Sequence, residues 1–256
     1  MWTYLGQNFL IDSKVKYYIF EKIQKLYTDL WCDALIEIWP GKGSITKLIW
    51  TISDNFFVIE KDETLIPNLK FQIPNIQSFE GDVLNLDVEK LLQQKKLNPS
   101  QTLIVWNLPY YITSPILRKF FGYGKQEFAW WIFMVQDEVG QKLKSDAKKK
   151  SYLRRLLNYA YTVTYLKWVP AKCFKPIPKV KSCLIQLTIK SEQPTIAFEK
   201  LIEFLELFAP FSRKTLGAIQ KMIQKKSDIK FIIPESLQKK RLEELTWKNL
   251  ETIFAK

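Results

Sequence analysis

The sequence predicts an α/β protein with a doubly wound, mostly parallel sheet, followed by a small helical domain. Two observations predict this. Short apolar runs suited to buried strands alternate with stretches suited to helices over the first three quarters of the chain. From about residue 192 onward, apolar residues recur every three or four positions, which is the helical period. We therefore expect one large domain over residues 1–191 and a basic helical domain over residues 192–256.

The elements of the first domain are predicted in a regular order. Asp12 and Ser13 can cap a helix whose apolar face contains Val15, Ile19 and Ile23. The elements that follow are a strand at 34–38, a turn at 40–43, a helix at 44–53, and strands at 56–59, near 81–82, at 103–105, at 131–135 and at 183–187. Because these strands alternate with helical stretches, we expect most of them to be parallel.

Chemistry-bearing groups follow four of these strands at their carboxyl ends. They are the turn at 40–43, Glu60, Asp82 and the tetrapeptide at 107–110. In an open α/β sheet, ligands bind at the carboxyl ends of the strands. The four groups are therefore expected to form one site.

Three of these groups suit an adenosine-containing cofactor. A glycine turn at Gly41 lets a ligand approach the backbone closely. Glu60 can accept hydrogen bonds from both ribose hydroxyls, and Asp82 can accept one from the adenine amino group. Either acid alone could be a solvated strand end, but the order and spacing favour the cofactor. NAD is disfavoured, because the G-x-G-x-x-G pattern would need glycine where Thr46 stands.

The tetrapeptide at 107–110 suits the reacting amino group of a nucleobase. The lone pair of an adenine amino group is delocalised, so the group is a poor nucleophile. The side-chain carbonyl of Asn107 and the backbone carbonyl of Pro109 can accept its two N–H bonds and direct the lone pair at a methyl donor. Tyr110 can stack on an extruded base. Such catalysis works by positioning and needs no general base, although a simple turn with a buried tyrosine is the alternative.

Charge is unevenly distributed along a chain whose net formal charge is +13. Residues 1–146 carry 16 Lys+Arg against 17 Asp+Glu, whereas residues 147–256 carry 23 against 9. We interpret this as a catalytic part joined to a part that binds a polyanion. The alternative interpretation is general solubility.

Composition excludes several function classes. The chain has no histidine, which excludes Ser-His and Cys-His catalysis and most catalytic zinc sites. Its three cysteines form no CxxC pair, so neither a disulfide framework nor a metal site is expected. No run of eighteen apolar residues and no signal-peptide pattern occurs, which predicts a cytoplasmic protein that does not span a membrane.

The motifs together resemble those of the KsgA-type small-subunit ribosomal RNA adenine dimethyltransferases. The similar segments keep the family's order: 6–10 (GQNFL), 37–46 (EIWPGKGSIT), 58–62 (VIEKD), 81–84 (GDVL), 107–110 (NLPY), 134–139 (MVQDEV), 174–182 (FKPIPKVKS) and 211–216 (FSRKTL). The resemblance implies a Rossmann-like methyltransferase sheet with a small all-helical carboxyl-terminal domain. It also implies S-adenosylmethionine as the cofactor and two adjacent adenines near the 3′ end of small-subunit ribosomal RNA as the substrate.

The resemblance also implies roles for individual residues. Asn8 and Leu10 would contact the cofactor, as would the turn that begins at position 39. Asn107 would hold both the cofactor and the target amino group, and Phe174 would sandwich the target base together with Tyr110. The implied partner is the nascent small ribosomal subunit, and the protein is expected to act as a monomer in the cytoplasm.

Two tryptophans depart from the family pattern. Trp39 stands where the family has glycine, and Trp106 where it has a small residue. The chain contains 8 glycines and 9 tryptophans, whereas an ordinary glycine content of about 7% would give roughly 18 glycines. We hypothesise that some of these tryptophans are UGA codons that the source organism reads as glycine. The alternative is genuine tryptophan in a divergent enzyme.

Two rival functions remain. One is a resistance-type methyltransferase acting on large-subunit ribosomal RNA, which shares most cofactor motifs. The segments around Phe174 and Arg213 favour the small-subunit type. The other is a nucleic-acid-binding protein that has lost methylation, as in the mitochondrial transcription factors of this superfamily. Trp39 favours this second rival, and the intact tetrapeptide at 107–110 argues against it.

Overall fold

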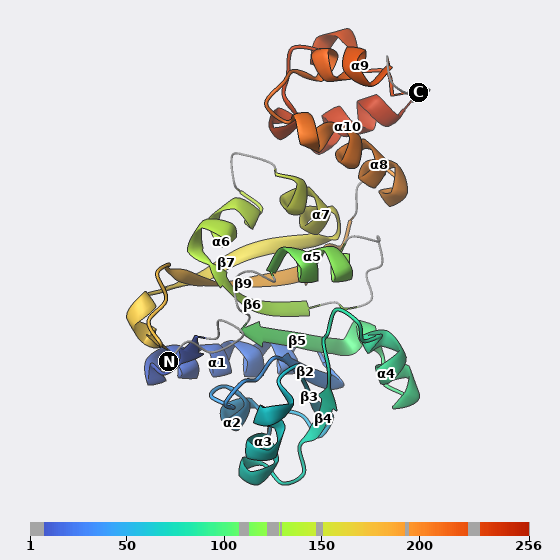
Figure 1. Ribbon diagram of the computed structural model, residues 1–256. Helices are drawn as coiled ribbons and strands as arrows, with labels where there is room; N and C mark the ends of the chain where they lie inside the picture. Colours follow the sequence, from blue (N-terminus) through green and yellow to red (C-terminus); the bar gives the residue numbers. More distant parts are fainter. Residues whose placement is uncertain are drawn as a thin grey trace.

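The computed structural model describes most of the chain. The described residues are 8–107, 113–121, 128, 130–146, 151–192, 195–224 and 231–255, and the side chains of Asn107 and Ser114 lie outside this description. Figure 1 shows a central sheet with helices on both faces and a group of helices beyond one of its edges.

The sheet has seven strands in the order β4-β3-β2-β5-β6-β9-β7. All neighbouring strands pair in parallel except β9, which runs antiparallel to both β6 and β7. From β2 the chain proceeds to β3 and β4 on one side, and it then continues with β5 on the other side, so the strand order reverses between β2 and β5. An open α/β sheet binds its ligand at this point. The strands are β4 (Gln77–Glu80), β3 (Phe56–Glu60), β2 (Ala34–Ile38), β5 (Thr102–Asn107), β6 (Trp130–Gln136), β9 (Ser182–Ile189) and β7 (Tyr161–Val169).

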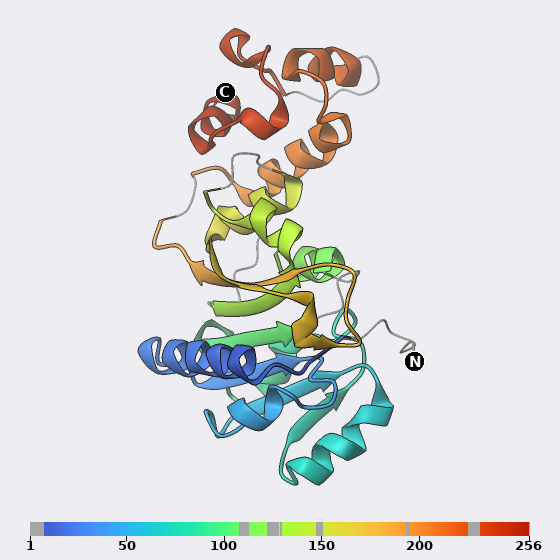
Figure 2. The same ribbon diagram turned by 90° about the vertical axis from the view of Figure 1, so that its left-hand side faces the viewer.

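The helices cover both faces of the sheet. Those of the first part are α1 (Ser13–Asp29), α2 (Thr46–Ile49), α3 (Ile66–Gln72), α4 (Val88–Gln94), α5 (Thr113–Phe121), α6 (Asp137–Leu143) and α7 (Tyr152–Ala160). One core cluster joins α1 and α2 to one face, and a second joins α4, α5 and α7 to the other. Because both faces are covered, the inner strands are buried along their whole length and mostly apolar, as β2 and β3 show. Figure 2 shows α1 lying along its face of the sheet.

Helix α1 begins as predicted. The Asp12 side chain accepts a hydrogen bond from the backbone N–H of Val15 at 2.9 Å, which satisfies one free donor of the first turn. The predicted apolar face, Val15, Ile19 and Ile23, is buried.

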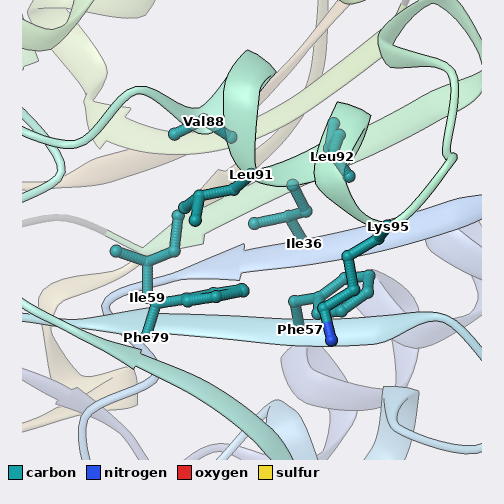
Figure 3. A pocket seen from close by; sticks show the side chains of 8 residues that line it. All are labelled: Ile36, Phe57, Ile59, Phe79, Val88, Leu91, Leu92 and Lys95. Atoms are coloured by element: carbon teal, nitrogen blue, oxygen red, sulfur yellow. The ribbon is translucent and has the colours of Figure 1, made fainter.

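Helix α4 seals the opposite face over β2, β3 and β4. Its Leu92 packs against Ile36 and Phe57, and the Lys95 ammonium lies 5.6 Å from the centre of the Phe57 ring. Figure 3 shows these side chains around an apolar gap of about 10 Å³. A gap of this size is at the lower limit for one water molecule and has no polar lining apart from the lysine.

The last part of the chain contains helices and short turns within its described residues. Its helices are α8 (Phe198–Phe208), α9 (Leu216–Gln224) and α10 (Trp247–Phe254). Of the apolar positions that follow the helical period here, Phe198, Leu205 and Phe208 are buried on α8, and Ile202 is half-buried. The core cluster under α4, α5 and α7 continues without a break into these helices.

The predicted fold class is confirmed, with three local differences. The predicted helix at 44–53 is wrong in length, because only α2 is helical. The residues that follow it form a tighter turn, closed by a hydrogen bond from Ile52 N–H to Ile49 C=O. Strand β7 was not predicted, because at this sheet edge exposed Thr162 and Thr164 interrupt the apolar run. A small pair of strands, β1 (Phe9–Leu10) and β8 (Phe174–Lys175), was also not predicted.

Candidate functional site

The turn after β2 has an unusual backbone. Trp39, Gly41 and Gly43 have φ angles of +57°, +60° and +77°. Trp39 N–H donates to the carbonyl of Ile59 on β3 at 2.7 Å. Only glycine adopts such angles without strain, so the turn requires glycine at three alternate positions and has it at two.

Glu60, at the end of β3, holds this turn in place. One carboxylate oxygen accepts the N–H of Gly41 and the other accepts the N–H of Asp62, both at 2.9 Å. The side chain is 1% exposed. Burial raises the pKa of Glu60, although the backbone N–H donors act in the opposite direction. Three backbone N–H groups act on this carboxylate, those of Gly41, Asp62 and Lys61, so one of its four lone pairs stays available for a ligand hydroxyl.

Asp82 lies at the end of the neighbouring strand β4, beside Glu60. The N–H of Gly81 donates to the Glu60 backbone carbonyl at 2.8 Å, which ties the two strand ends together. The Asp82 carboxylate accepts Lys61 Nζ at 2.8 Å and Leu84 N–H at 3.0 Å. Burial acts to raise the pKa of Asp82, but the hydrogen bonds from Lys61 and Leu84 prevail and lower it. The structure therefore brings two predicted carboxylates together at one sheet edge.

Glu37 is a third acid at this edge, and the sequence analysis gave it no role. It lies in β2 and is 4% exposed, and its Oε2 atom has no hydrogen-bond partner. Burial raises its pKa to about 8, the Thr46 hydroxyl acts to lower it, and Glu60 acts to raise it. The signal in the sequence was a single acid inside an otherwise apolar strand. A buried acceptor without a partner suits a ligand that carries a positive charge.

The amino-terminal strand covers the turn from one side. A Cβ atom on Gly41 would lie 3.1 Å from the ring of Phe9, so the ring and the turn are in close contact. The Lys42 ammonium lies 4.7 Å from the centre of the same ring. Sequence analysis gave no role to Phe9, although it lies in the first motif. Asn8 is half-buried next to it.

Leu10 and Phe174 are direct neighbours across the β1–β8 pair, and each is 1% exposed. The structure thus brings the amino-terminal motif to the predicted base-stacking residue. The stacking role of Phe174 and the cofactor contacts of Asn8 and Leu10 stay predictions.

Asn107 ends β5, next to Met134 of β6. This places its backbone at the same sheet edge as Glu60. Its side chain, Pro109 and Tyr110 lie outside the described residues, so their predicted roles at the reacting amino group stay predictions.

Trp39 and Trp106 are buried beside this edge. Their exposed fractions are 6% and 1%, and both indole N–H groups lack a hydrogen-bond partner. Trp106 stacks on Phe133 with ring centres 3.6 Å apart. A buried donor without a partner costs roughly 1–3 kcal/mol. Neither tryptophan is therefore accommodated as buried tryptophans usually are, with the N–H bonded.

The polar groups of the edge fit an adenosine-containing cofactor. Two carboxylates at adjacent strand ends offer acceptors, Gly41 permits close approach, and Glu37 is a buried acceptor without a partner. The side chain of Trp39 is the one part that does not fit, because it adds bulk to a turn built on alternate glycines.

The second part of the chain presents basic side chains before α9. Arg213 and Lys214 are both exposed. The turn that carries them is fixed by a bond from Lys214 N–H to Phe211 C=O at 2.8 Å and by a bridge between Thr215 and Arg241. Exposed cations on a fixed turn suit contact with phosphate groups.

Among the residues that the structure describes, no group of three or more His, Cys, Asp or Glu residues could hold a metal ion. No helix in the described part of the chain has both the length and the apolar character needed to cross a membrane.

A family model and curated relatives match the chain over most of its length. The model of ribosomal RNA adenine dimethylase matches residues 2–253. The "Ribosomal RNA small subunit methyltransferase A" of Chlorobium limicola is 32% identical over 252 residues, which covers 98% of this chain and 90% of the relative. The protein of the same name from Aster yellows witches'-broom phytoplasma is 31% identical, and the match covers 98% of this chain and 94% of the relative.

Two solved structures share the fold. A dimethyladenosine transferase from Plasmodium falciparum superposes with a TM-score of 0.74 at 21% identity, covering 96% of this chain and 97% of that one. The 23S rRNA methyltransferase ErmE gives a TM-score of 0.69 at 21% identity, covering 97% of this chain and 100% of that one. Both likenesses concern the fold, including the helices at the carboxyl end.

Proposed function

The chain belongs to the ribosomal RNA adenine dimethylase family, and on that premise we propose that it dimethylates two adjacent adenines near the 3′ end of small-subunit ribosomal RNA. The enzyme depends on S-adenosylmethionine. The observation that supports this most directly is the sheet edge at which Glu60 and Asp82 lie beside the Gly41 turn.

The cofactor would be held by groups already described. Glu60 would accept the ribose hydroxyls, Asp82 the adenine amino group, and Gly41 would allow close approach of the backbone. Asn8 and Leu10 would close the site from the amino-terminal side. When bound, S-adenosylmethionine supplies an activated methyl group.

The protein's own contribution to the chemistry is positioning. Asn107 and Pro109 would accept the two N–H bonds of the adenine amino group, and Tyr110 and Phe174 would hold the ring between them. Aligning the nitrogen lone pair lowers the entropy cost of the reaction, without requiring a side chain to remove a proton in advance.

The RNA would be recognised mainly by the second part of the chain. We place the division between the parts at residues 191 and 192, and the partner is the nascent small subunit, bound by a monomer of this protein. The alternative substrate, large-subunit RNA, is supported by shared cofactor motifs and by fold likeness to ErmE at 21% identity. The relatives that share 31–32% identity over nearly the whole chain carry the small-subunit name.

A methylation assay tests this function. The protein is incubated with labelled S-adenosylmethionine and either immature small subunits or large-subunit RNA, and the RNA is digested and analysed by mass spectrometry. We expect dimethyladenosine in small-subunit RNA only. Label found only in large-subunit RNA would contradict the proposal and show that the protein methylates the rival substrate.

Glu60→Ala is expected to weaken cofactor binding by roughly 1–3 kcal/mol, because charge-assisted hydrogen bonds to the ribose are lost. Calorimetric titration with S-adenosylmethionine measures the effect. Because Glu60 also holds the Gly41 turn, the thermal stability of the free variant is measured in parallel. Glu63→Ala, at an exposed position three residues later, is the matched control and should bind normally. Normal binding by Glu60→Ala would remove this residue from the site.

Replacing Arg213 and Lys214 by Glu is expected to weaken binding to small subunits while cofactor affinity stays the same. The reason is that phosphate contacts dominate RNA affinity, which should also fall steeply with salt. The control exchanges exposed Lys70 and Lys90 for Glu, which changes the net charge equally at a distance from the basic turn. Equal losses in both double variants would indicate a general charge effect instead of a contact.

A further inference from the structure

We propose that the cavity between α7 and the helical domain is an anion site that binds a phosphate group. The cavity has a volume of about 250 Å³ and lies where α7 and β7 meet the start of α10. Three cations line it: Arg154, Arg155 and Lys190. The volume is far above the roughly 10–15 Å³ needed by one water molecule. This site lies outside the methyl-transfer site and is independent of its chemistry.

The three cations have neutral partners only. Their acceptors are backbone carbonyls, which carry no formal charge: those of Lys144 and Ser145 for Arg154, of Leu242 and Leu245 for Arg155, and of Asn158 for Lys190. Among the described residues, none of the three forms an ion pair with a carboxylate. The acid that acts on Arg154 is Asp146, which is exposed and pairs with Lys144 at 3.6 Å.

Arg155 provides the strongest indication of a missing anion. Its side chain is 2% exposed, and its Nε–H has no hydrogen-bond partner. Burial and the neighbouring Arg154 lower the pKa of Arg155 to about 10. Burial and Arg154 also lower the pKa of Lys190. Burying cations close together without an anion is costly, so an anion that entered the cavity would relieve both the desolvation and the mutual repulsion.

The remaining lining suits phosphate in particular. Thr162 and Thr246 contribute hydroxyl groups to the wall, whereas the hydroxyl of Ser145, which also lines it, already donates its hydrogen to Asn158 Oδ1. Thr246 is also the N-cap of α10, which has eight residues, and the amino-terminal end of a helix attracts negative charge. Several donors with fixed positions around one positively charged cavity match the oxygens of a phosphate better than a planar carboxylate.

The phosphate could belong to the RNA backbone or to a free phosphate-bearing molecule, and two measurements separate these sources. The first follows the melting temperature as inorganic phosphate replaces chloride at constant ionic strength. We expect a saturable rise for the unmodified protein. For Lys190→Gln, the half-saturating phosphate concentration should increase at least about fivefold, whereas Lys70→Gln should behave as the unmodified protein does.

The second measurement is the salt dependence of binding to a small-subunit RNA fragment without cofactor. If an RNA phosphate occupies the cavity, Lys190→Gln should reduce the slope of log K against log salt by about 0.7–0.9. Lys70→Gln should leave it unchanged. If Lys190→Gln changes only the half-saturating phosphate concentration, the cavity binds a free phosphate-bearing molecule. If it also reduces the slope of log K against log salt, the cavity binds a phosphate of the RNA backbone.

Thr162→Glu gives an independent check, because Thr162 is exposed at the cavity wall and its replacement supplies the missing negative charge. We expect this variant to melt at a higher temperature than the unmodified protein in phosphate-free buffer and to lose the response to phosphate. The proposal is wrong if Lys190→Gln changes neither the half-saturating phosphate concentration nor the slope of log K against log salt for RNA binding. Since no readout involves methyl transfer, failure here leaves the proposed enzymatic function untouched.

Discussion

Asn107→Ala is expected to reduce methyl transfer by roughly 10²-fold or more while RNA affinity stays nearly unchanged. The backbone of Asn107 ends β5 at the sheet edge that carries Glu60. In the proposed mechanism the target amino group meets the methyl donor at this edge. Removing its side-chain carbonyl leaves one N–H of the amino group without an acceptor, so the nitrogen lone pair is no longer directed. In the proposed mechanism Asn107 acts on the reacting nitrogen and not on phosphates, whose contacts dominate RNA affinity.

Single-turnover rates and RNA binding are measured side by side for this variant. Asn75→Ala is the matched control, because Asn75 is an exposed asparagine between α3 and β4. It should have full activity. Full activity of Asn107→Ala would show that the reacting nitrogen is aligned by other groups.

The double variant Trp39→Gly with Trp106→Gly is expected to bind S-adenosylmethionine at least about tenfold tighter than the chain as written, a difference of about 1.4 kcal/mol. The structure bears out the conformation that this expectation required, because Trp39 has a φ angle of +57°. A side chain in that conformation adds roughly 1–2 kcal/mol of strain. Glycine at both positions would also remove two buried indole N–H groups that have no partner.

Calorimetric titration of the double variant checks this expectation. Trp168→Gly is the control, because Trp168 lies half-exposed on β7 and its backbone is extended. It should give no gain in cofactor affinity. Equal affinity of the double variant and the chain as written would show that the turn accepts tryptophan.

The same structure extends the codon hypothesis to a third position. In the described residues, three positions other than glycine have positive φ angles, and two of them are Trp31 and Trp39. Trp31 follows the carboxyl end of α1 with φ of +50° and is 83% exposed. That position after a helix is commonly glycine. Sequencing the gene decides the matter, since UGG at codons 31, 39 and 106 would contradict recoding.

The sheet could be predicted from the sequence because most of its inner strands are nearly continuous apolar runs. The end of β3 followed from the same signal, and with it the position of Glu60. Strand β4 carries one apolar residue, so the position of Asp82 depended on the order and spacing of the motifs. Edge strand β7 was not predicted, because its outward side chains are polar. Strand β1 was not predicted, because a strand of two residues shows no periodicity in the sequence.

The contacts within the site were harder to predict than its members. The ion pair between Lys61 and Asp82 depends on how two strand ends lie side by side, which no local pattern encodes. Phe9 could not be assigned to the Gly41 turn for the same reason, since the two are brought together by β8, far along the chain. The cationic cavity depends on residues as distant as Arg155 and Leu245, which become neighbours only in the folded protein.

The unbroken core between the sheet and the carboxyl-terminal helices has a consequence for the thermodynamics of RNA recognition. Arg155 bonds the carbonyls of Leu242 and Leu245, and the Tyr159 hydroxyl donates to the Ile196 carbonyl at 2.7 Å. With apolar side chains continuous across the same boundary, the two parts lose their freedom of relative motion when the chain folds. That entropy is then not lost a second time on binding, so the protein meets its RNA as a preorganised surface.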